Sequence, residues 1–234
     1  MTAQQDSSRI SESFSADLRV IDLGTDVPYG RALALQEEAA RARQSGDSAT
    51  DCLFLLEHSP VFTLGRSADP SHLLWTQEKL LARGIAVEKT ARGGDITYHG
   101  PGQLVGYPVL RLGSEARRVV PYVNAIEETL LQSVARWGIE ARRDRRNRGI
   151  WVGNAKLVAV GVRISGGMTT HGFALNVAPD LTAYSGIVPC GLQDAGVTSL
   201  AELLPQVPSM AVVKQVVTEV FAAVFGYAGL SRDV

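Results

Sequence analysis

Residues 149–164 read GIWVGNAKLVAVGVRI, two apolar runs separated by Gly153-Asn154. Two such runs around a short glycine-containing turn are typical of a β-hairpin, so we expect strands over 149–152 and 156–164. The alternating run Thr170–Val177 predicts a third strand. This stretch decides the fold class, because it puts neighbouring antiparallel strands in the middle of the chain.

The segments on either side alternate between strands and helices. We expect further strands over 18–23, 52–57, 61–64, 85–88 and 103–110, with 52–57 and 61–64 paired around the turn at 58–60. Helices are predicted over 28–43, 76–84, 119–137 and 209–225, each ending at or near a glycine. Strands grouped in hairpins with a few helices on one or both faces predict an α/β fold with a mixed sheet and flanking helices.

Composition narrows the class of protein. The 234 residues are 45% hydrophobic and 20% charged, which fits a globular chain with a substantial core. The net charge of −1 gives no global preference for nucleic acid or for acidic membranes, and no apolar run has membrane-spanning length. Residues 1–16 are polar and serine-rich, so we expect a disordered tail followed by a single domain over 17–234. Two cysteines make no disulfide framework, and we expect a reducing, cytoplasmic location.

Cys190 stands in the segment Ile187-Val188-Pro189-Cys190-Gly191. Proline fixes its own φ and glycine permits close approach, so this turn suits the presentation of a single nucleophilic thiol. The alternative is a buried apolar cysteine, which is what most free cysteines are. Cys52 lies in the apolar run 52–56 and is predicted to be a buried strand residue.

A glycine-rich stretch, RGGDITYHGPGQ, covers residues 92–103. Backbone N–H groups along such a loop bind a carbonyl, a thioester or a phosphate, and Arg92 adds a permanent charge beside them. The alternative is a tight connection between strands, with Tyr98 and His99 as ordinary packed residues. Both interpretations stay open on the sequence alone.

Lys156 begins an otherwise apolar strand. Most such lysines extend their ammonium group to solvent, whereas one drawn inward is a catalytic candidate because desolvation shifts its pKa readily. His171 and Gly172 are either strand filler or pocket lining. The four histidines are scattered and no zinc-ligand spacing occurs, so no metal site is expected.

Five arginines fall within residues 142–148. One interpretation is a solvated loop. The other is a docking site for an acidic protein or a phosphate-bearing partner.

Taken together, these motifs resemble those of the lipoyl(octanoyl) transferases. The resemblance runs from about Leu18 to Leu204 and rests on LEHSPVFTLGRSAD, RGGDITYHGPGQLVGYPVL, GIWVGNAKLVAVGVRI, TTHGFALNV, and IVPCG followed by VTSL. It implies a fold similar to the catalytic domains of biotin protein ligases and lipoate–protein ligases.

The resemblance also implies a reaction. An octanoyl group passes from the phosphopantetheine thioester of acyl carrier protein to a protein cysteine, and then to a lysine of a lipoyl domain in 2-oxoacid dehydrogenase complexes or the glycine cleavage H protein. It implies Cys190 as the nucleophile, Lys156 as the lysine that lowers its pKa, and no separate cofactor. The implied substrate-binding residues are Arg92, Gly93, Gly94, Asp95, Ile96, Thr97, Tyr98, His99, Ala159, Val160, Gly161, Gly172, Phe173 and Ala174. Of these, Val160 and Phe173 are the candidates for lining an acyl tunnel.

Two other functions remain at this point. One is an ATP-dependent lipoate or biotin ligase, which activates a free acid as its adenylate on the same scaffold. The other is a non-catalytic module that uses the arginine cluster to hold an acidic carrier domain.

Overall fold

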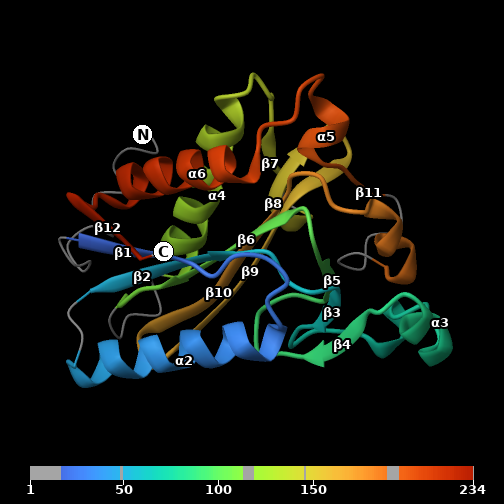
Figure 1. Ribbon diagram of the computed structural model, residues 1–234, viewed down its shortest axis with the longest axis horizontal. Coiled ribbons are helices and arrows are strands. Elements are labelled where there is room, and N and C mark those ends of the chain that lie inside the picture. The colour runs from blue at the N-terminus through green and yellow to red at the C-terminus, as the bar shows by residue number, and fades with distance from the viewer. Residues whose placement is uncertain (1–16, 48–49, 113–118, 145, 189–194, 234) are drawn as a thin grey trace.

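A large mixed β-sheet runs through the middle of the molecule, with helices on both of its faces (Figure 1). The computed structural model describes residues 17–47, 50–112, 119–144, 146–188 and 195–233. The expected tail at 1–16 lies outside these residues. Within them, the mixed sheet and flanking helices confirm the predicted fold class.

The sheet has the strand order β12-β1-β2-β6-β10-β9-β8-β7, and β11 pairs separately with β9. β12 and β2 are parallel to β1, as β11 is to β9, and the remaining neighbours are antiparallel. The strands are β1 (Asp17–Asp22), β2 (Asp51–Leu56), β6 (Gln103–Val109), β7 (Arg142–Asp144), β8 (Asn147–Val152), β9 (Ala155–Ser165), β10 (Met168–Asn176), β11 (Gly196–Val197) and β12 (Gly229–Asp233).

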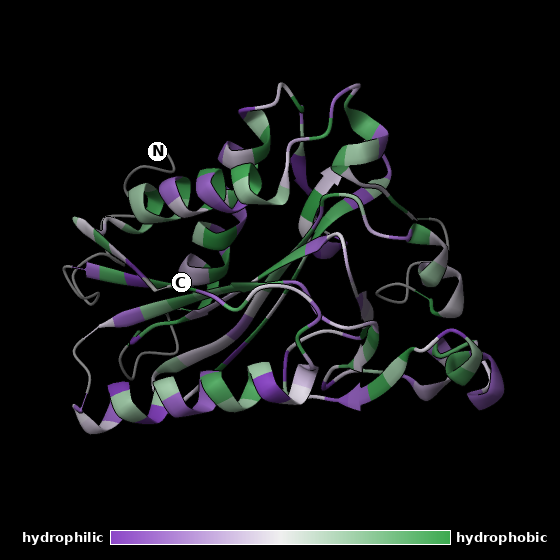
Figure 2. Cartoon of the chain, in the orientation of Figure 1, coloured by the Kyte–Doolittle hydropathy of each residue, from purple (hydrophilic) through white to green (hydrophobic). Residues whose placement is uncertain are grey.

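Helix α2 covers one face of this sheet, and α4 and α6 pack together on the other (Figure 1). The helices are α2 (Tyr29–Ser45), α3 (Gln77–Ala82), α4 (Val119–Ala135), α5 (Leu200–Leu203) and α6 (Met210–Phe225), with 3₁₀ turns η2 (Pro70–His72) and η4 (Leu181–Gly186). Figure 2 shows mostly hydrophobic strands between helices of mixed hydropathy. No helix in the described ranges is long and apolar enough to cross a bilayer.

Local sequence signals set the ends of the helices. The hydroxyl of Ser209 accepts a hydrogen bond from Val212 N at the start of α6, and Thr76 caps α3 in the same way. Gly46 and Gly226 follow α2 and α6 with φ of 88° and 78°, in the left-handed region where glycine carries no Cβ penalty.

A second, three-stranded sheet lies at one end of the large sheet (Figure 1). Its order is β4 (Ala86–Lys89), β3 (Val61–Leu64) and β5 (Ile96–His99). The expected pairing of 52–57 with 61–64 is therefore wrong, because β2 lies between β1 and β6 while β3 lies between β4 and β5. The turn at 58–60 carries the chain from one sheet to the other.

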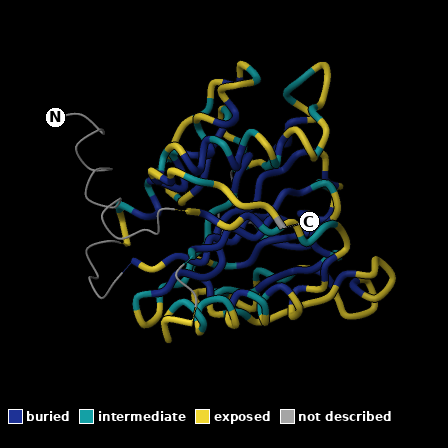
Figure 3. The backbone as a smooth tube through the Cα atoms, turned by 60° about the vertical axis from the view of Figure 1, so that its left-hand side comes forward, coloured by how far each residue is buried: buried dark blue, intermediate teal, exposed yellow. Residues whose placement is uncertain are grey.

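Burial is concentrated in the central strands (Figure 3). Every residue of β2, β6 and β10 is buried, as expected for strands covered on both faces. The small sheet has its own apolar core around Phe62, Trp75 and Tyr98. The small sheet thus has a core of its own, against which Val197 of β11 also packs.

Pro108 interrupts the ladder between β6 and β10. Proline has no N–H to donate, and the regular pairing ends at Phe173 with Gly106. Beyond that point, the hydroxyl of Thr169 donates to Pro108 O and accepts from Leu110 N, both at 2.8 Å. His171 takes a positive φ of 57° here, so the interruption turns this residue away from a regular strand path.

Candidate active site

A cavity of about 540 Å³, including the part open to solvent, lies where the large sheet meets the small one. Thirteen of the fourteen expected substrate-binding residues line it, and so does Lys156. The remaining lining residues are Tyr29, Tyr107, Asn147 and His171.

Small residues of β9 and β10 form the floor of the cavity. Ala159 pairs with Ala174, and Gly161 pairs with Gly172, across the two strands. A Cβ on Gly172 would lie 2.2 Å from Gly106 O, a backbone atom that cannot easily move. The absence of side-chain bulk at these positions leaves the space that a substrate needs.

A β-bulge in β9 brings Lys156 to the same cavity. Ile150 pairs with Val158 and Trp151 pairs with Lys156, so Leu157 has no partner on β8. Leu157 and Val158 both pack into the main core, which a regular alternating strand would not allow. The extra residue therefore shifts the alternation, and Lys156 joins Ala159 in the cavity lining.

Lys156 is drawn inward, with only 6% of its surface exposed. Its Nζ donates to Asn147 Oδ1 at 2.7 Å and to Arg148 O at 3.3 Å, and it lies 4.9 Å from the centroid of a ring of Trp151. The lysine is therefore drawn inward and not extended to solvent. The β7–β8 hairpin thus fixes the position of the ammonium group.

The glycine-rich loop forms one wall of the cavity. Gly93 N donates to Val162 O at 2.9 Å, so the loop runs along the edge of β9 beyond the end of β8. Arg92 is buried, and its guanidinium donates from Nε to Thr63 Oγ1 at 3.1 Å and from Nη1 to Gly93 O at 3.1 Å. A cation is therefore held in place beside backbone N–H groups.

Neutral histidines occupy the polar side of the cavity. Burial lowers the pKa of His171 to about 4, with a smaller contribution from Arg92. Burial likewise holds the pKa of His99 well below its ordinary value, and His99 Nδ1 lies 2.7 Å from Gln103 Oε1. Gln103 uses Nε2 to donate to Asn176 Oδ1 at 2.9 Å, so its oxygen accepts from His99 and the other ring nitrogen of His99 is an acceptor.

Cys190 lies in the segment 189–194, outside the described residues, but both neighbours of this segment reach the cavity region. Val188 N donates to His72 O at 2.9 Å, and the His72 ring contacts the carboxylate of Asp95, a cavity residue. On the other side, Val197 of β11 pairs with Lys156. The described residues before and after the segment thus contact neighbours of the cavity.

Tyr98 is the one expected binding residue that does not line the cavity. Alternation along β5 turns it into the core of the small sheet, where its ring lies 5.8 Å from Phe62 and 5.7 Å from Tyr184. Phe173 and Val160 border the cavity, but they pair across β10 and β9 and pack with the main core. The Phe173 ring lies over Gly106, where a Cβ would overlap it.

Three lining residues carry no sequence signal for a site. Tyr29 begins α2, Tyr107 lies within an apolar strand, and Asn147 is hidden among the arginines of residues 142–148. Only the pairing of β8 with β9 reveals Asn147 as the partner of Lys156. Among the residues with described positions, no group of three or more His, Cys, Asp or Glu side chains is arranged to hold a metal ion.

Comparison with known proteins defines the class. Residues 28–222 match the model of the lipoyl protein ligase A/B catalytic domain. Among solved structures, a Thermoplasma acidophilum protein with bound lipoic acid superposes with a TM-score of 0.76 at 18% identity, covering 93% of this chain and 90% of its own. A bipartite lipoate protein ligase of that organism, described with its E2 lipoyl domain, gives 0.73 at 16% identity, with 93% and 88% coverage. The chain belongs to the lipoyl protein ligase A/B catalytic-domain family.

Closer relatives place it within that family. An octanoyltransferase of Chloroflexus aggregans is 45% identical over 211 residues, which cover 89% of this chain and 95% of the relative. An octanoyltransferase of Solibacter usitatus is 49% identical over 177 residues, covering 76% and 80%. The chain is thus one of the octanoyltransferases, enzymes of protein lipoylation.

Proposed function

We propose that this enzyme moves an octanoyl group from octanoyl-acyl carrier protein to a lysine of a lipoyl domain, through a thioester on Cys190. The observation that carries the proposal is Lys156, buried at the cavity and paired through Val197 with the strand that follows the Cys190 segment. Because the T. acidophilum ligase is described with its E2 lipoyl domain, a lipoyl-domain acceptor is consistent with the family.

Thiolate formation is the first requirement. A thiol with an ordinary pKa of ~8.5 is only about 3% ionised at neutral pH, whereas one lowered to ~7 is about half ionised. An ammonium group at Lys156 stabilises the thiolate of Cys190 by charge. Asn147 and Arg148 O hold that ammonium group in place, so the stabilisation needs little rearrangement.

The transfer then runs in two balanced steps. The thiolate attacks the thioester carbonyl, and the tetrahedral intermediate expels the pantetheine thiolate, which takes a proton from Lys156. The neutral acceptor amine next attacks the acyl-cysteine, Lys156 removes its extra proton, and the Cys190 thiolate leaves. The donor thioester supplies the free energy of amide formation, so the reaction needs neither ATP nor a separate cofactor.

The cavity receives the acyl chain. The small residues of its floor give the chain a flat apolar surface, and each buried methylene contributes about 0.8 kcal/mol until the space ends. Backbone N–H groups of the glycine-rich loop are candidates for stabilising the oxyanion. We place the reaction in the cytoplasm, where acyl carrier protein and lipoyl domains meet.

Intact mass spectrometry tests the proposal directly. After incubation with octanoyl-acyl carrier protein and no acceptor, we expect one octanoyl adduct that hydroxylamine removes and that Cys190→Ser abolishes. Cys52 is the internal control, because it is buried in β2. An adduct on Cys52, or one that persists in Cys190→Ser, contradicts the assignment.

A ligase reaction is the alternative on the same scaffold. The solved relatives that resemble ligases share less than a fifth of their sequence with this chain, so they support the fold alone. With ATP and free octanoate but no acyl carrier protein, we expect no octanoylation of a lipoyl domain. Robust product under those conditions would favour the ligase.

A further inference from the structure

A second cleft adjoins the acyl cavity, and arginines line it. We call it the arginine cleft, and its lining residues are Gly94, Glu127, Arg143, Asp144, Arg146, Asn147, Arg148 and Val160. Gly94, Asn147 and Val160 line the acyl cavity as well. The arginine cleft and the acyl cavity are therefore adjacent.

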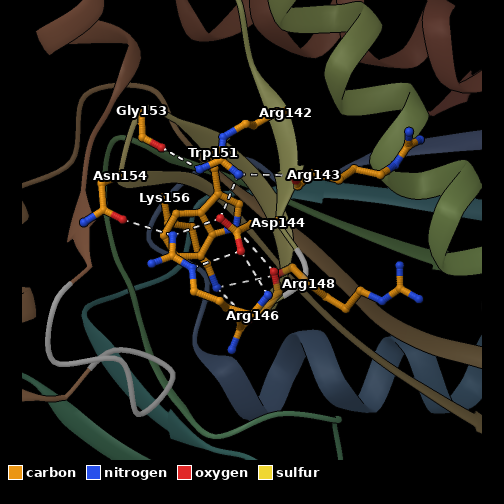
Figure 4. Close-up of polar contacts among 10 residues, drawn as sticks. Arg142, Arg143, Asp144, Arg146, Arg148, Trp151, Gly153, Asn154 and Lys156 are labelled. Carbon is orange, nitrogen blue, oxygen red and sulfur yellow. Dashed lines mark hydrogen bonds and ion pairs between the residues drawn. The ribbon is translucent and has the colours of Figure 1, made fainter.

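Two carboxylates, Asp144 and Glu127, hold the guanidinium groups of the cleft in place, and Figure 4 shows Asp144 among the arginines. Asp144 is only 8% exposed and accepts from Arg146 Nε at 3.0 Å and Nη2 at 2.9 Å. Glu127 is 1% exposed and lies 3.2 Å from Arg148 Nη1 and 3.3 Å from Arg143 Nε. For the described arginines the loop interpretation is wrong, since Arg142, Arg143 and Arg148 lie in β7 and β8 at the edge of the sheet and Arg146 lies between these strands.

The guanidinium groups of the cleft arginines are partly exposed to solvent. The side chains of Arg143, Arg146 and Arg148 are 40%, 41% and 49% exposed, while their carboxylate partners in the cleft lie beneath them. Arg143 also pairs with Glu128 at 2.7 Å, so Arg148 is the cleft arginine whose only carboxylate partner among the described residues is Glu127. Within the described residues, Arg148 donates only from Nη1, so Nε and Nη2 remain available for a ligand.

We infer that the arginine cleft binds the phosphodiester of the donor's phosphopantetheine arm, with Arg148 as its principal contact. The inference rests on the proposed function, which puts the sulfur end of that arm beside Lys156. The other end of the arm is a phosphodiester of single negative charge, and the Nε and Nη2 groups of Arg148 are donors suited to its oxygens. Arginine forks fit phosphate oxygens in a bidentate manner, and a recessed cleft suits a slender arm better than the convex acidic surface of a carrier protein.

Two small thioesters isolate this contact. Octanoyl-phosphopantetheine carries the phosphate, and octanoyl-pantetheine differs from it only in lacking that group. For Arg148→Gln we expect the kcat/KM with octanoyl-phosphopantetheine to fall roughly tenfold or more, because a charge-assisted bond is lost, while the value with octanoyl-pantetheine changes little. The matched control is Arg142→Gln, because Arg142 also pairs with Asp144 but does not line the cleft.

The possible outcomes separate the alternatives. Equal losses with both thioesters would mean that Arg148 supports the hairpin or Lys156, and would overturn the inference. A loss with octanoyl-acyl carrier protein alone would assign the arginines to the carrier surface instead. If the wild type forms no acyl-cysteine with any of the three donors, the proposed function itself has failed.

If the small thioesters react too slowly for kinetics, a competition experiment tests the same contact. S-methyl-phosphopantetheine should inhibit transfer from octanoyl-acyl carrier protein more strongly than S-methyl-pantetheine. In Arg148→Gln that difference should vanish. Equal inhibition of the wild type by both compounds would contradict a phosphate subsite.

Discussion

Asn147 illustrates how a single side chain positions the chemistry. Its amide oxygen accepts from the Lys156 ammonium at 2.7 Å, while its backbone oxygen accepts from Trp151 Nε1 at 3.3 Å. The residue therefore ties the lysine to the hairpin that carries it. Because Asn147 is a neutral acceptor, it orients the Lys156 ammonium group without cancelling its charge. That charge remains available to stabilise the proposed thiolate.

We predict that Asn147→Ala lowers kcat roughly tenfold or more, because a hydrogen bond to a charged group is worth ~1.5–3 kcal/mol. It should also raise the pH at which iodoacetamide alkylates Cys190, in the same direction as Lys156→Ala. Asn124→Ala is the control, since Asn124 contacts Arg148 from α4 but lies outside the cavity lining. An alkylation profile that overlays the wild type would show that Asn147 has only a structural role.

At the level of strands, the sequence predicted most elements but not which way their side chains face. Periodicity and caps place α2, α4, α6 and the β8–β9 hairpin close to their observed bounds. Strict alternation from Ala159 would have turned Lys156 toward the core, and the bulge at Leu157 reverses this. A bulge depends on pairing between two strands, so the sequence of one strand does not reveal it.

In the candidate site, likewise, the sequence predicted some residues and missed others. Residues within the glycine-rich loop and β9–β10 were predictable because their motifs resemble those of a family. Tyr98, expected at the substrate, packs instead in the core of the small sheet, because its strand β5 was not expected from the sequence. Tyr29 and Tyr107 come to the site from other elements, and only the tertiary structure brings them there.

The floor of the cavity gives a prediction about acyl chain length. Ala174→Val adds two methyl groups to the floor, and overpacking typically costs ~1–3 kcal/mol. We expect kcat/KM to shift from octanoyl toward hexanoyl carrier substrates. Phe173→Leu should shift the profile less, because Phe173 packs mainly in the core on the other face of β10. A larger shift in Phe173→Leu than in Ala174→Val would contradict this account.

For the whole molecule, buried histidines make stability depend on pH. Burial lowers the pKa of His58 and of His171 to about 4 in the folded protein. The unfolded chain, with histidine pKa values of ~6.5, binds more protons between about pH 6.5 and 4, so stability falls as the pH falls through that window. Below about 4 these two groups cause no further loss.

We therefore expect the free energy of unfolding, measured with urea, to drop by about 1–2 kcal/mol per histidine between pH 7 and 5. His58→Gln should flatten this dependence, since glutamine can still donate to Val27 O, the partner of His58 Nδ1. An unchanged slope in His58→Gln would mean that other groups dominate the acid sensitivity.

Ile187, which precedes the segment 189–194, packs in the core of the small sheet, and Val197, which follows it, pairs with Lys156 of the large sheet. The described residues on either side of the proposed nucleophile therefore depend on two packing units, the core of the small sheet, which is the smaller unit, and the large sheet. Local opening of the smaller unit needs less free energy than global unfolding. On slow heating, we expect catalytic activity to be lost while the helical circular dichroism is still intact. Local opening of the small sheet, and not global unfolding, then sets the highest temperature at which the enzyme is active.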